Sequence, residues 1–227
     1  MDINRKAWND RHKALRKALE NKSNCKSAIE LFLIQHGMVH SAKLSKPSIH
    51  SFEDEILNDL PMNAWRYIPP NGNHSIAWII WHLARVEDVT MNLLIANKQQ
   101  VLNKNGWLQK LRIEFTHTGN DMSNEKVHDL NNRIDVSVLR EYWLAVAGET
   151  RKIVKELEPA NYKQKVDPSQ IQRIWDEHAM LPGGKAIVNY WASRTIVGLL
   201  LMPPTRHCIL HLNEANRIKA GSFRSLS

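Results

Sequence analysis

The segment SIAWIIWHLARVEDVTMNLLIAN, residues 75–97, constrains the fold of this chain more than any other. It contains no glycine or proline, and its apolar residues recur at steps of three and four, the spacing that lines a face of an α-helix. These residues are Ile76, Ile79, Ile80, Leu83, Val86 and Leu94. We therefore predict a long central helix that packs on more than one side.

The remaining sequence is helical in pattern as well. Asn73 and Ser75 are candidate N-caps for the central helix, and a polar stretch, HTGNDMSNEK (117–126), predicts a surface connection in which Ser123 caps a short helix. We find no internal repeat and no strand-like alternation, so we predict an all-α fold. The other helices that we predict cover residues 4–20, 27–42, 52–60, 135–157, 167–180, 185–202 and 205–219.

Composition is that of a soluble globular protein. Hydrophobic residues make up 43% and charged residues 24%, which excludes disordered and collagen-like chains. The longest apolar stretches are much shorter than the roughly 20 residues that cross a bilayer, and the charged N-terminus lacks the apolar region of a secretory signal. We expect a cytoplasmic protein with no membrane partner. Cys25 and Cys208 form no CxxC pattern, so we expect two thiols rather than a disulfide framework or a cysteine zinc site.

The chain is basic. It carries 31 Lys and Arg against 23 Asp and Glu, a net charge of +8 that attracts anions in general. Part of the excess lies in the predicted first helix, where a solvated face explains it. No helix-turn-helix, zinc-finger or RNA-binding signature accompanies the charge, so we expect no nucleic-acid partner. An affinity for nucleic acid that falls steeply with salt and survives loss of the histidines would contradict this expectation.

Two histidines stand four residues apart in TRHCILHLNEANRIK (205–219), just after Pro203 and Pro204. Either one long helix from about residue 195 is kinked at the prolines, or a new helix begins there with proline in its first turn. In both cases His207 and His211 share a helix face with Cβ atoms about 5–6 Å apart, so their imidazoles can converge on one point. The spacing alone is not diagnostic, because such pairs also occur by chance.

A third histidine strengthens the case for a site. His82 lies inside the apolar central helix, where a buried polar side chain needs a partner. Taken alone, it is interpreted as a core histidine that is hydrogen-bonded to a neighbour. Glu214 continues the helix stripe of His207 and His211, and a cation would satisfy the imidazoles. Three neutral imidazoles from two helices can hold Zn²⁺ or a similar ion while other coordination positions stay open.

The sequence NHSIAWIIWHLARVED (73–88), followed far downstream by RHxxxH and HLNEA, resembles the DinB/YfiT-like superfamily of metalloenzymes. The resemblance spans residues 28–218 and implies a DinB-like four-helix bundle in which His82, His207 and His211 bind a divalent metal ion. On this basis we divide the chain into a basic N-terminal helical extension, a helical bundle and a C-terminal tail, which cover residues 1–24, 25–220 and 221–227. Short inserted helices are expected within residues 98–134 and 160–183.

Members of that superfamily include transferases and isomerases that use bacillithiol, mycothiol or similar small thiols. The resemblance therefore implies an enzyme that depends on a divalent transition metal, with Zn, Ni, Mn and Fe all open. It implies most directly a transferase that acts on a small molecule with a low-molecular-weight thiol, and a hydrolase that activates water is compatible with the same site. The alternative is a non-enzymatic bundle, a binding or stress-response protein whose histidines hold a structural metal or none. Surplus apolar helices also suggest a homodimer.

Other polar residues near these motifs have two interpretations each. Glu214 orients a histidine ligand or accepts a proton, or it is an exposed glutamate beside Arg217. His36 and His40, in QHGMVH, either line the same cavity as the metal ligands or belong to the helical core.

The residues that flank the histidines are also open to interpretation. Trp78 and Trp81 either wall a pocket or pack as ordinary core residues. Cys208 points about 100° around the helix from its neighbour His207, so we expect a small core residue rather than a nucleophile. HCILH lacks the glutamate of HExxH, which excludes the metalloprotease class, and LPGGKA lacks the spacing of a phosphate-binding loop.

Overall fold

The computed structural model describes residues 2–20, 25–45, 48–70, 72 and 74–225. Within these ranges no strand forms beyond an isolated bridge between Lys165 and Thr195, so the predicted all-α fold is confirmed. None of the described helices has both the length and the apolar content to span a bilayer. The α-helices are α1 (Ile3–Glu20), α2 (Cys25–Val39), α3 (Phe52–Leu57), α4 (Met62–Arg66), α5 (Ile76–Asp88), α6 (Trp107–Leu111), α7 (Asn124–Arg133), α8 (Val136–Glu156), α9 (Pro168–Asp176), α10 (Lys185–Ser193), α11 (Ile196–Leu200) and α12 (Cys208–Ser225).

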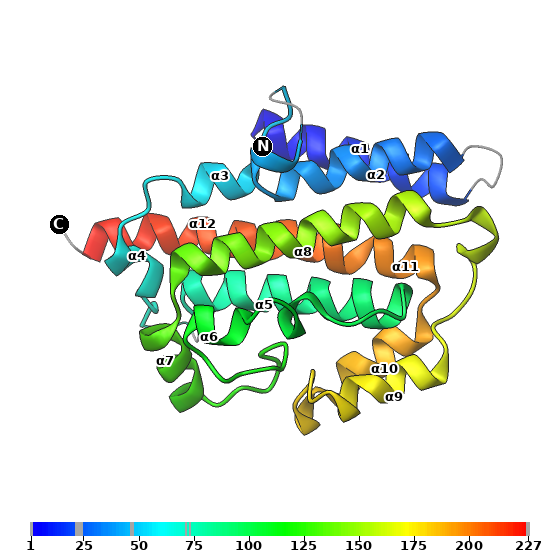
Figure 1. The fold of residues 1–227 in the computed structure, drawn as a ribbon. Coiled ribbons are helices and arrows are strands. Elements are labelled where there is room, and N and C mark those ends of the chain that lie inside the picture. The colour runs from blue at the N-terminus through cyan, green and yellow to red at the C-terminus, as the bar shows by residue number, and fades with distance from the viewer. Residues whose placement is uncertain (1, 21–24, 46–47, 71, 73, 226–227) are drawn as a thin grey trace.

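Four helical segments lie alongside one another and form the bundle: α2, α5, α8 and the run from α11 to α12 (Figure 1). Both α8 and α12 pack on α5, and α1 lies against the outer side of α2. Trp8, Leu15 and Leu19 are buried on α1, so this basic helix turns its apolar side towards the bundle. The predicted four-helix bundle with an extra N-terminal helix is therefore present.

The central helix α5 is enclosed on all sides. Every residue from Ile76 to Asp88 is buried, because α4, α7, α8 and α12 all contact this helix. The helix begins at Ser75, whose Oγ accepts a hydrogen bond from the backbone N–H of Trp78 at 3.1 Å. Ser123 caps α7 in the same manner. Both predicted serine caps are confirmed, whereas Asn73 lies outside the described residues.

Two helices continue into wider, π-helical turns. One, Val89–Ile95, follows α5, and the other, Met202–His207, joins α11 to α12. The two consecutive prolines in the second turn cannot donate hydrogen bonds, which removes the partners of two carbonyl groups in the preceding turn. Thr205 Oγ1 donates to the carbonyl of Leu200 at 3.1 Å and so satisfies one of them. The structure thus shows the first of the two alternatives, a long helix that is interrupted at the prolines.

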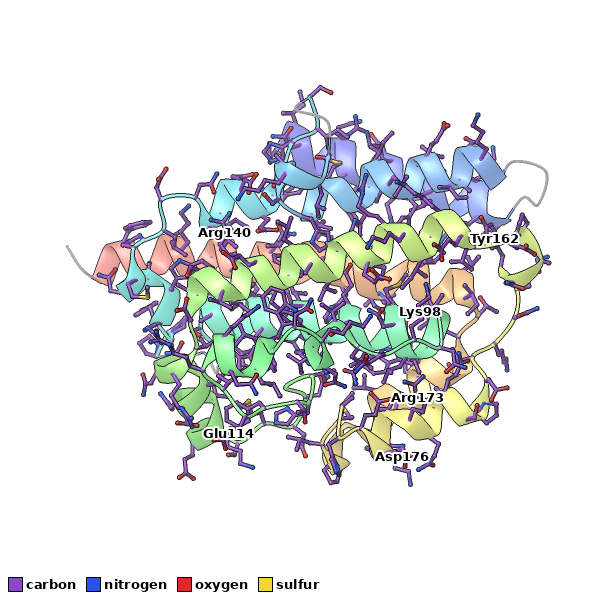
Figure 2. The ribbon with its side chains drawn as sticks, viewed as in Figure 1. Lys98, Glu114, Arg140, Tyr162, Arg173 and Asp176 are labelled. Atoms are coloured by element: carbon purple, nitrogen blue, oxygen red, sulfur yellow. The ribbon has the colours of Figure 1, made fainter. Side chains whose placement is uncertain are left out.

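A second layer covers the side of α5 that faces away from α1 and α2, and it contains α6, α7, α9 and α10 (Figure 1). Arg173, which is labelled in Figure 2, lies on α9 in this layer. Its guanidinium donates to Asn97 Oδ1 at 2.7 Å, to the Lys98 carbonyl at 3.3 Å and to Glu177 Oε1 at 2.7 Å. The contacts with Asn97 and Lys98 tie α9 to the chain that leaves the π-helical turn after α5.

Candidate metal centre

The structure brings the three predicted metal ligands together. His82 lies in the middle of α5, His207 ends the π-helical turn, and His211 lies in the first turn of α12. One ring nitrogen from each histidine can be selected so that the three nitrogens lie within 4.8 Å of one another. The ring centroid of His82 is 5.0 Å from that of His207 and 5.1 Å from that of His211. Residues 125 positions apart in the chain therefore share one cluster of imidazoles.

A backbone carbonyl fixes the orientation of His82. The Nδ1 of His82 lies 2.7 Å from the carbonyl oxygen of Thr118, and because a carbonyl can only accept, Nδ1 carries the hydrogen. Burial lowers the pKa of His82 to about 3, so the ring is neutral and its Nε2 is unprotonated. That lone pair faces the Nε2 of His207 at 3.2 Å. The Thr118 carbonyl thus orients His82 in the same way as the carbonyl groups that accept hydrogen bonds from metal-bound histidines.

A carboxylate fixes the orientation of His211. The Nδ1 of His211 donates to Glu214 Oε2 at 2.8 Å, which leaves the Nε2 of His211 free for a ligand. The other oxygen, Oε1, lies 3.7 Å from His74 Nδ1. The hydrogen bond from His211, together with the nearby His74, holds the pKa of Glu214 well below its usual value, so Glu214 is a carboxylate. Of its two interpretations, the structure shows the one in which Glu214 orients a histidine.

His207 completes a donor set that fits a cation. Burial, followed by the effects of His82 and His211, keeps the pKa of His207 well below its usual value, so this ring is neutral too. Its buried Nδ1 has no hydrogen-bond partner among the described residues. Either His207 donates its Nε2 hydrogen to His82, or two lone pairs face each other at 3.2 Å. A cation that accepts both lone pairs would remove that repulsion, so these residues fit a divalent metal ion.

The loop before α7 is closer to the site than its sequence indicates. The polar stretch from residue 117 was predicted to lie on the surface, yet His117, Thr118 and Gly119 are buried and only later residues of the stretch are exposed. The burial follows from the contact between Thr118 and His82, which pulls the loop against α5. Trp78 stacks between His74, with ring centroids 3.6 Å apart, and His82, at 4.8 Å.

The two tryptophans beside His82 have different roles. Trp78 walls the cluster of imidazoles through its stacking on His82. Trp81 is fully buried away from it and packs against Tyr142 and the guanidinium of Arg85. Cys208 is also fully buried, and burial raises the pKa of its thiol well above the usual value, so it is an inert core residue as predicted.

Replacing Gly119 by alanine is expected to lower the free energy of unfolding by about 1–2 kcal/mol, because Gly119 has a left-handed backbone. Its φ is +87°, and an added Cβ would lie 3.2 Å from the Trp78 ring. Urea denaturation measures the change. Gly148→Ala is the matched control, since Gly148 is helical with no atom within 4 Å of the added Cβ, and we expect it to be neutral or stabilising. Equal effects of the two substitutions would contradict the strain at Gly119.

A small hollow opens beside the imidazoles. It has a volume of about 340 Å³ and includes His74 and Glu214, the residues next to His211 and Trp78. The side chain of His211 is itself 24% exposed. The remaining lining residues are Tyr67, Pro69, Gly72, Arg217, Ile218 and Gly221. The cluster is therefore reached from solvent on the His211 side, whereas His82 faces the core.

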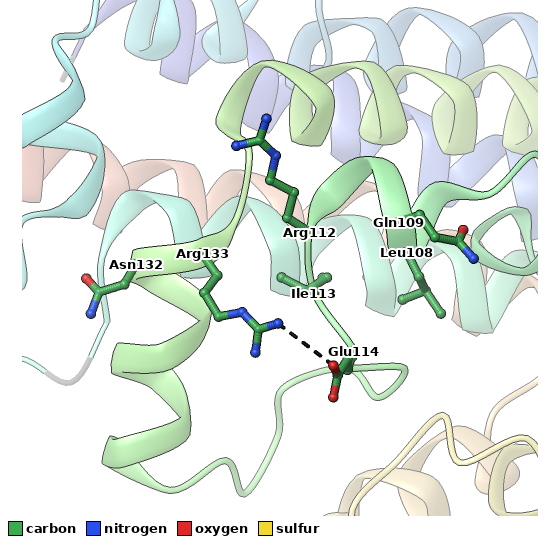
Figure 3. Close-up of a pocket in the computed structure, with 7 residues that line it drawn as sticks. All are labelled: Leu108, Gln109, Arg112, Ile113, Glu114, Asn132 and Arg133. Atoms are coloured by element: carbon green, nitrogen blue, oxygen red, sulfur yellow. Dashed lines mark ion pairs between the residues drawn. The ribbon is translucent and has the colours of Figure 1, made fainter.

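A wider hollow of about 820 Å³ lies elsewhere, between α6 and the end of α7 (Figure 3). An ion pair between Arg133 and Glu114, 3.8 Å long, crosses it. Its other lining residues are Leu108, Gln109, Arg112, Ile113 and Asn132. The lining includes no histidine or cysteine, and its one carboxylate, Glu114, pairs with Arg133, so the chemistry of the side chains, rather than the size of the hollow, identifies the candidate site.

His36 and His40 do not join this cluster. His36 lies in the last turn of α2 and His40 directly follows that helix, and both are fully buried against Glu87 at the end of α5. The interpretation that they line the cavity of the other histidines is therefore wrong, because α2 directs them towards the last turn of α5 rather than towards His82. Glu87 was not recognised from the sequence, although a carboxylate inside the most apolar helix of the chain is itself a signal.

Comparison with known proteins agrees with this architecture. The family model for the DinB superfamily matches residues 54–184, more than half of the chain. The matched segment includes His82 and ends before His207 and His211. No curated protein matches the chain. The three-histidine cluster is compatible with a metal site in a protein of this superfamily. The fold and the match together place the chain in the DinB superfamily.

Proposed function

We propose that His82, His207 and His211 hold a divalent transition-metal ion, and that the protein is a metal-dependent transferase that uses a small thiol. One observation carries the proposal: three neutral imidazoles converge, and the outer nitrogens of two of them are held by the Thr118 carbonyl and the Glu214 carboxylate. Such outer contacts are the usual support of histidine ligands. The transferase activity rests on the superfamily and on the hollow beside the site.

The surrounding residues supply binding and proton transfer. A divalent ion with three neutral ligands keeps its full charge, and when bound it lowers the pKa of an incoming thiol so that the thiolate forms at neutral pH. His74 lines the hollow beside Glu214, whose Oε1 is 3.7 Å from His74 Nδ1, so His74 is placed to accept the proton that the thiol loses. Trp78 excludes water from one side of His82 by stacking on its ring. The hollow is within the range of small-molecule sites.

Elemental analysis tests the metal site. The protein is purified without a histidine tag or added metal, beside His207→Ala/His211→Ala, and the metal that a chelator removes is counted. The parent is expected to lose one equivalent to the chelator, and the double variant none. His128→Ala, which removes an exposed histidine on α7, is the matched control and should behave as the parent. If the parent takes up no chelatable Zn²⁺, Ni²⁺ or Mn²⁺, the three residues are core histidines and not metal ligands.

The thiol reaction is tested on the same proteins. The parent, loaded with the metal that it retains, is mixed with a small thiol and an electrophilic acceptor, and loss of the free thiol is followed. Metal-dependent transfer that is absent from the double variant is expected. Metal binding without transfer would support the rival function, a non-enzymatic bundle with a structural ion. The partial exposure of His211 favours an open, catalytic site over a closed one.

Replacing Glu214 by glutamine is expected to weaken metal binding roughly 10–100-fold, as loss of an outer-shell carboxylate does. Glutamine keeps the shape of the side chain but removes the charge that accepts from His211 Nδ1. A competition titration with a chelator of known affinity measures the change. Glu114→Gln removes an exposed carboxylate far from the site and should leave the affinity unchanged. If both variants bind metal as the parent does, Glu214 does not support His211.

A further inference from the structure

A second cluster of metal-ligating side chains lies inside the bundle. His36 lies in the last turn of α2, His40 is the first residue after that helix, and Glu87 reaches them from the last turn of α5. The Nε2 of His36 is 2.9 Å from Glu87 Oε1, and the Nε2 of His40 is 3.0 Å from Glu87 Oε2. All three side chains are 0% exposed, and their candidate ligand atoms lie within 4.8 Å of one another.

The contact between His40 and Glu87 is not a proper hydrogen bond. Although the two atoms are 3.0 Å apart, their geometry does not meet the requirements of a hydrogen bond. Neither His40 Nε2 nor Glu87 Oε2 has a hydrogen-bond partner elsewhere in the described part of the chain. Leaving a buried polar atom unpaired costs about 1–3 kcal/mol, and more for a charged group. The ring nitrogen and the oxygen are thus two unpaired candidate ligand atoms, and they lie within the distance that two ligands of one ion can have.

The charges of the cluster also favour a cation. Burial lowers the pKa of His36 to about 4, so this ring is neutral. Burial acts to raise the pKa of Glu87, but His40 and His36 outweigh it and hold that pKa well below its usual value. Glu87 is therefore a buried carboxylate that faces two imidazoles, and either a protonated imidazole or a metal cation has to balance its charge. Two imidazoles and one carboxylate are a donor set that binds zinc and other divalent transition metals.

The surroundings of the cluster close it to solvent. Phe32 stacks on His36 with ring centroids 5.4 Å apart, and Trp143 from α8 lies edge-on to His40 at 4.8 Å. The side chain of His211 is partly exposed, whereas all three side chains of this cluster are fully buried. An ion at this position would contact no incoming substrate, and it would leave only when the bundle opens. The role that fits such a site is structural.

We propose that His36, His40 and Glu87 bind a second divalent transition-metal ion, which joins α2 to α5 in the interior of the bundle. This site is separate from the three-histidine cluster and does not depend on the proposed function. Because it is closed, its ion exchanges slowly, whereas the ion of the three-histidine cluster is open to chelators.

Counting chelator-resistant zinc tests the proposal. The parent and the His207→Ala/His211→Ala variant are produced in medium that contains zinc sulfate, treated with a chelator and analysed for metal. Both are expected to keep one equivalent of zinc, which is released only when guanidinium unfolds the protein. Glu87→Gln should lose the resistant equivalent and keep the chelatable one. Glu53→Gln, which alters another buried glutamate, is the matched control and should keep both.

Three results would overturn the second site. A parent that retains no zinc after chelation shows that the three residues share a proton instead, and this measurement needs no core substitution. Resistant zinc that disappears in His207→Ala/His211→Ala belongs to the other cluster. Resistant zinc that persists in a folded Glu87→Gln or His40→Gln protein is held elsewhere. Each outcome differs from failure of the three-histidine site, which affects only the chelatable equivalent.

Discussion

An Asp88→Ala protein is expected to unfold with a free energy about 3–5 kcal/mol lower than that of the parent, the usual effect of breaking a buried ion pair from one side. Asp88 is fully buried at the end of α5. It accepts hydrogen bonds from Arg85 Nη1 at 2.9 Å and from the Tyr142 hydroxyl at 2.6 Å. It also accepts from the backbone N–H groups of Val101 and Leu102, at 2.8 and 2.9 Å. One carboxylate thus joins α5, α8 and the loop that follows the π-helical turn.

The large effect comes from the groups left behind. Arg85 is also fully buried, and without Asp88 its charge has no counterion among the residues that the structure describes. Urea denaturation followed by circular dichroism measures the change. Asp10→Ala, which breaks an exposed ion pair of 2.7 Å with Lys6, is the control and should barely shift the midpoint. Adding Arg85→Met to Asp88→Ala should recover part of the stability, because no unpaired charge remains. A loss no larger than that of Asp10→Ala would refute the argument.

The second large effect is a dependence of stability on pH that arises from Glu53. Burial raises the pKa of Glu53 to about 7, against the opposing effects of His40 and Arg140, whereas the ordinary value is 4.5. Because the folded protein favours the protonated carboxyl, the stabilisation is complete below pH 4.5 and is lost as the pH rises through 7. The shift corresponds to about 3 kcal/mol.

Glu53→Gln isolates this contribution from those of the histidines. At pH 5 the variant and the parent should have similar free energies of unfolding. At pH 8 the variant should be the more stable by about 3 kcal/mol, because glutamine does not ionise. Chemical denaturation at both pH values provides the two differences. A difference that is the same at pH 5 and pH 8 would show that Glu53 titrates normally in the folded protein.

Local sequence predicted the parts of the site that local geometry determines. The spacing of His207 and His211 places them on one helix face wherever that helix lies. The apolar pattern around His82 likewise indicated that this histidine is buried, and Ser75 marked the start of its helix. These predictions succeeded because each depends on residues within a few turns of one helix.

Contacts between distant segments were not predictable in the same way. The carbonyl of Thr118 contacts His82 only because an inserted loop folds back on α5, and the polar composition of that loop indicated the surface instead. The cluster of His36, His40 and Glu87 depends on how α2 packs against α5, which periodicity does not determine. Backbone carbonyls also carry no sequence signature, so an outer contact of this kind is visible only in three dimensions.

The wide turn at Met202–His207 sets the rotation of the last helix. In an uninterrupted α-helix each residue turns the side chain by about 100°, so Leu199 and Cys208 would point in nearly opposite directions. Both are fully buried, but in different parts of the core: Leu199 lies with residues of α9 and α10, and Cys208 lies with residues of α5 and α12. The π-helical turn takes up more residues per circuit than an α-helical one, so it rotates α12 relative to α11 by less than an α-helical segment of the same length would. The direction in which His207 and His211 face is therefore a matter of helical phase, which this turn sets.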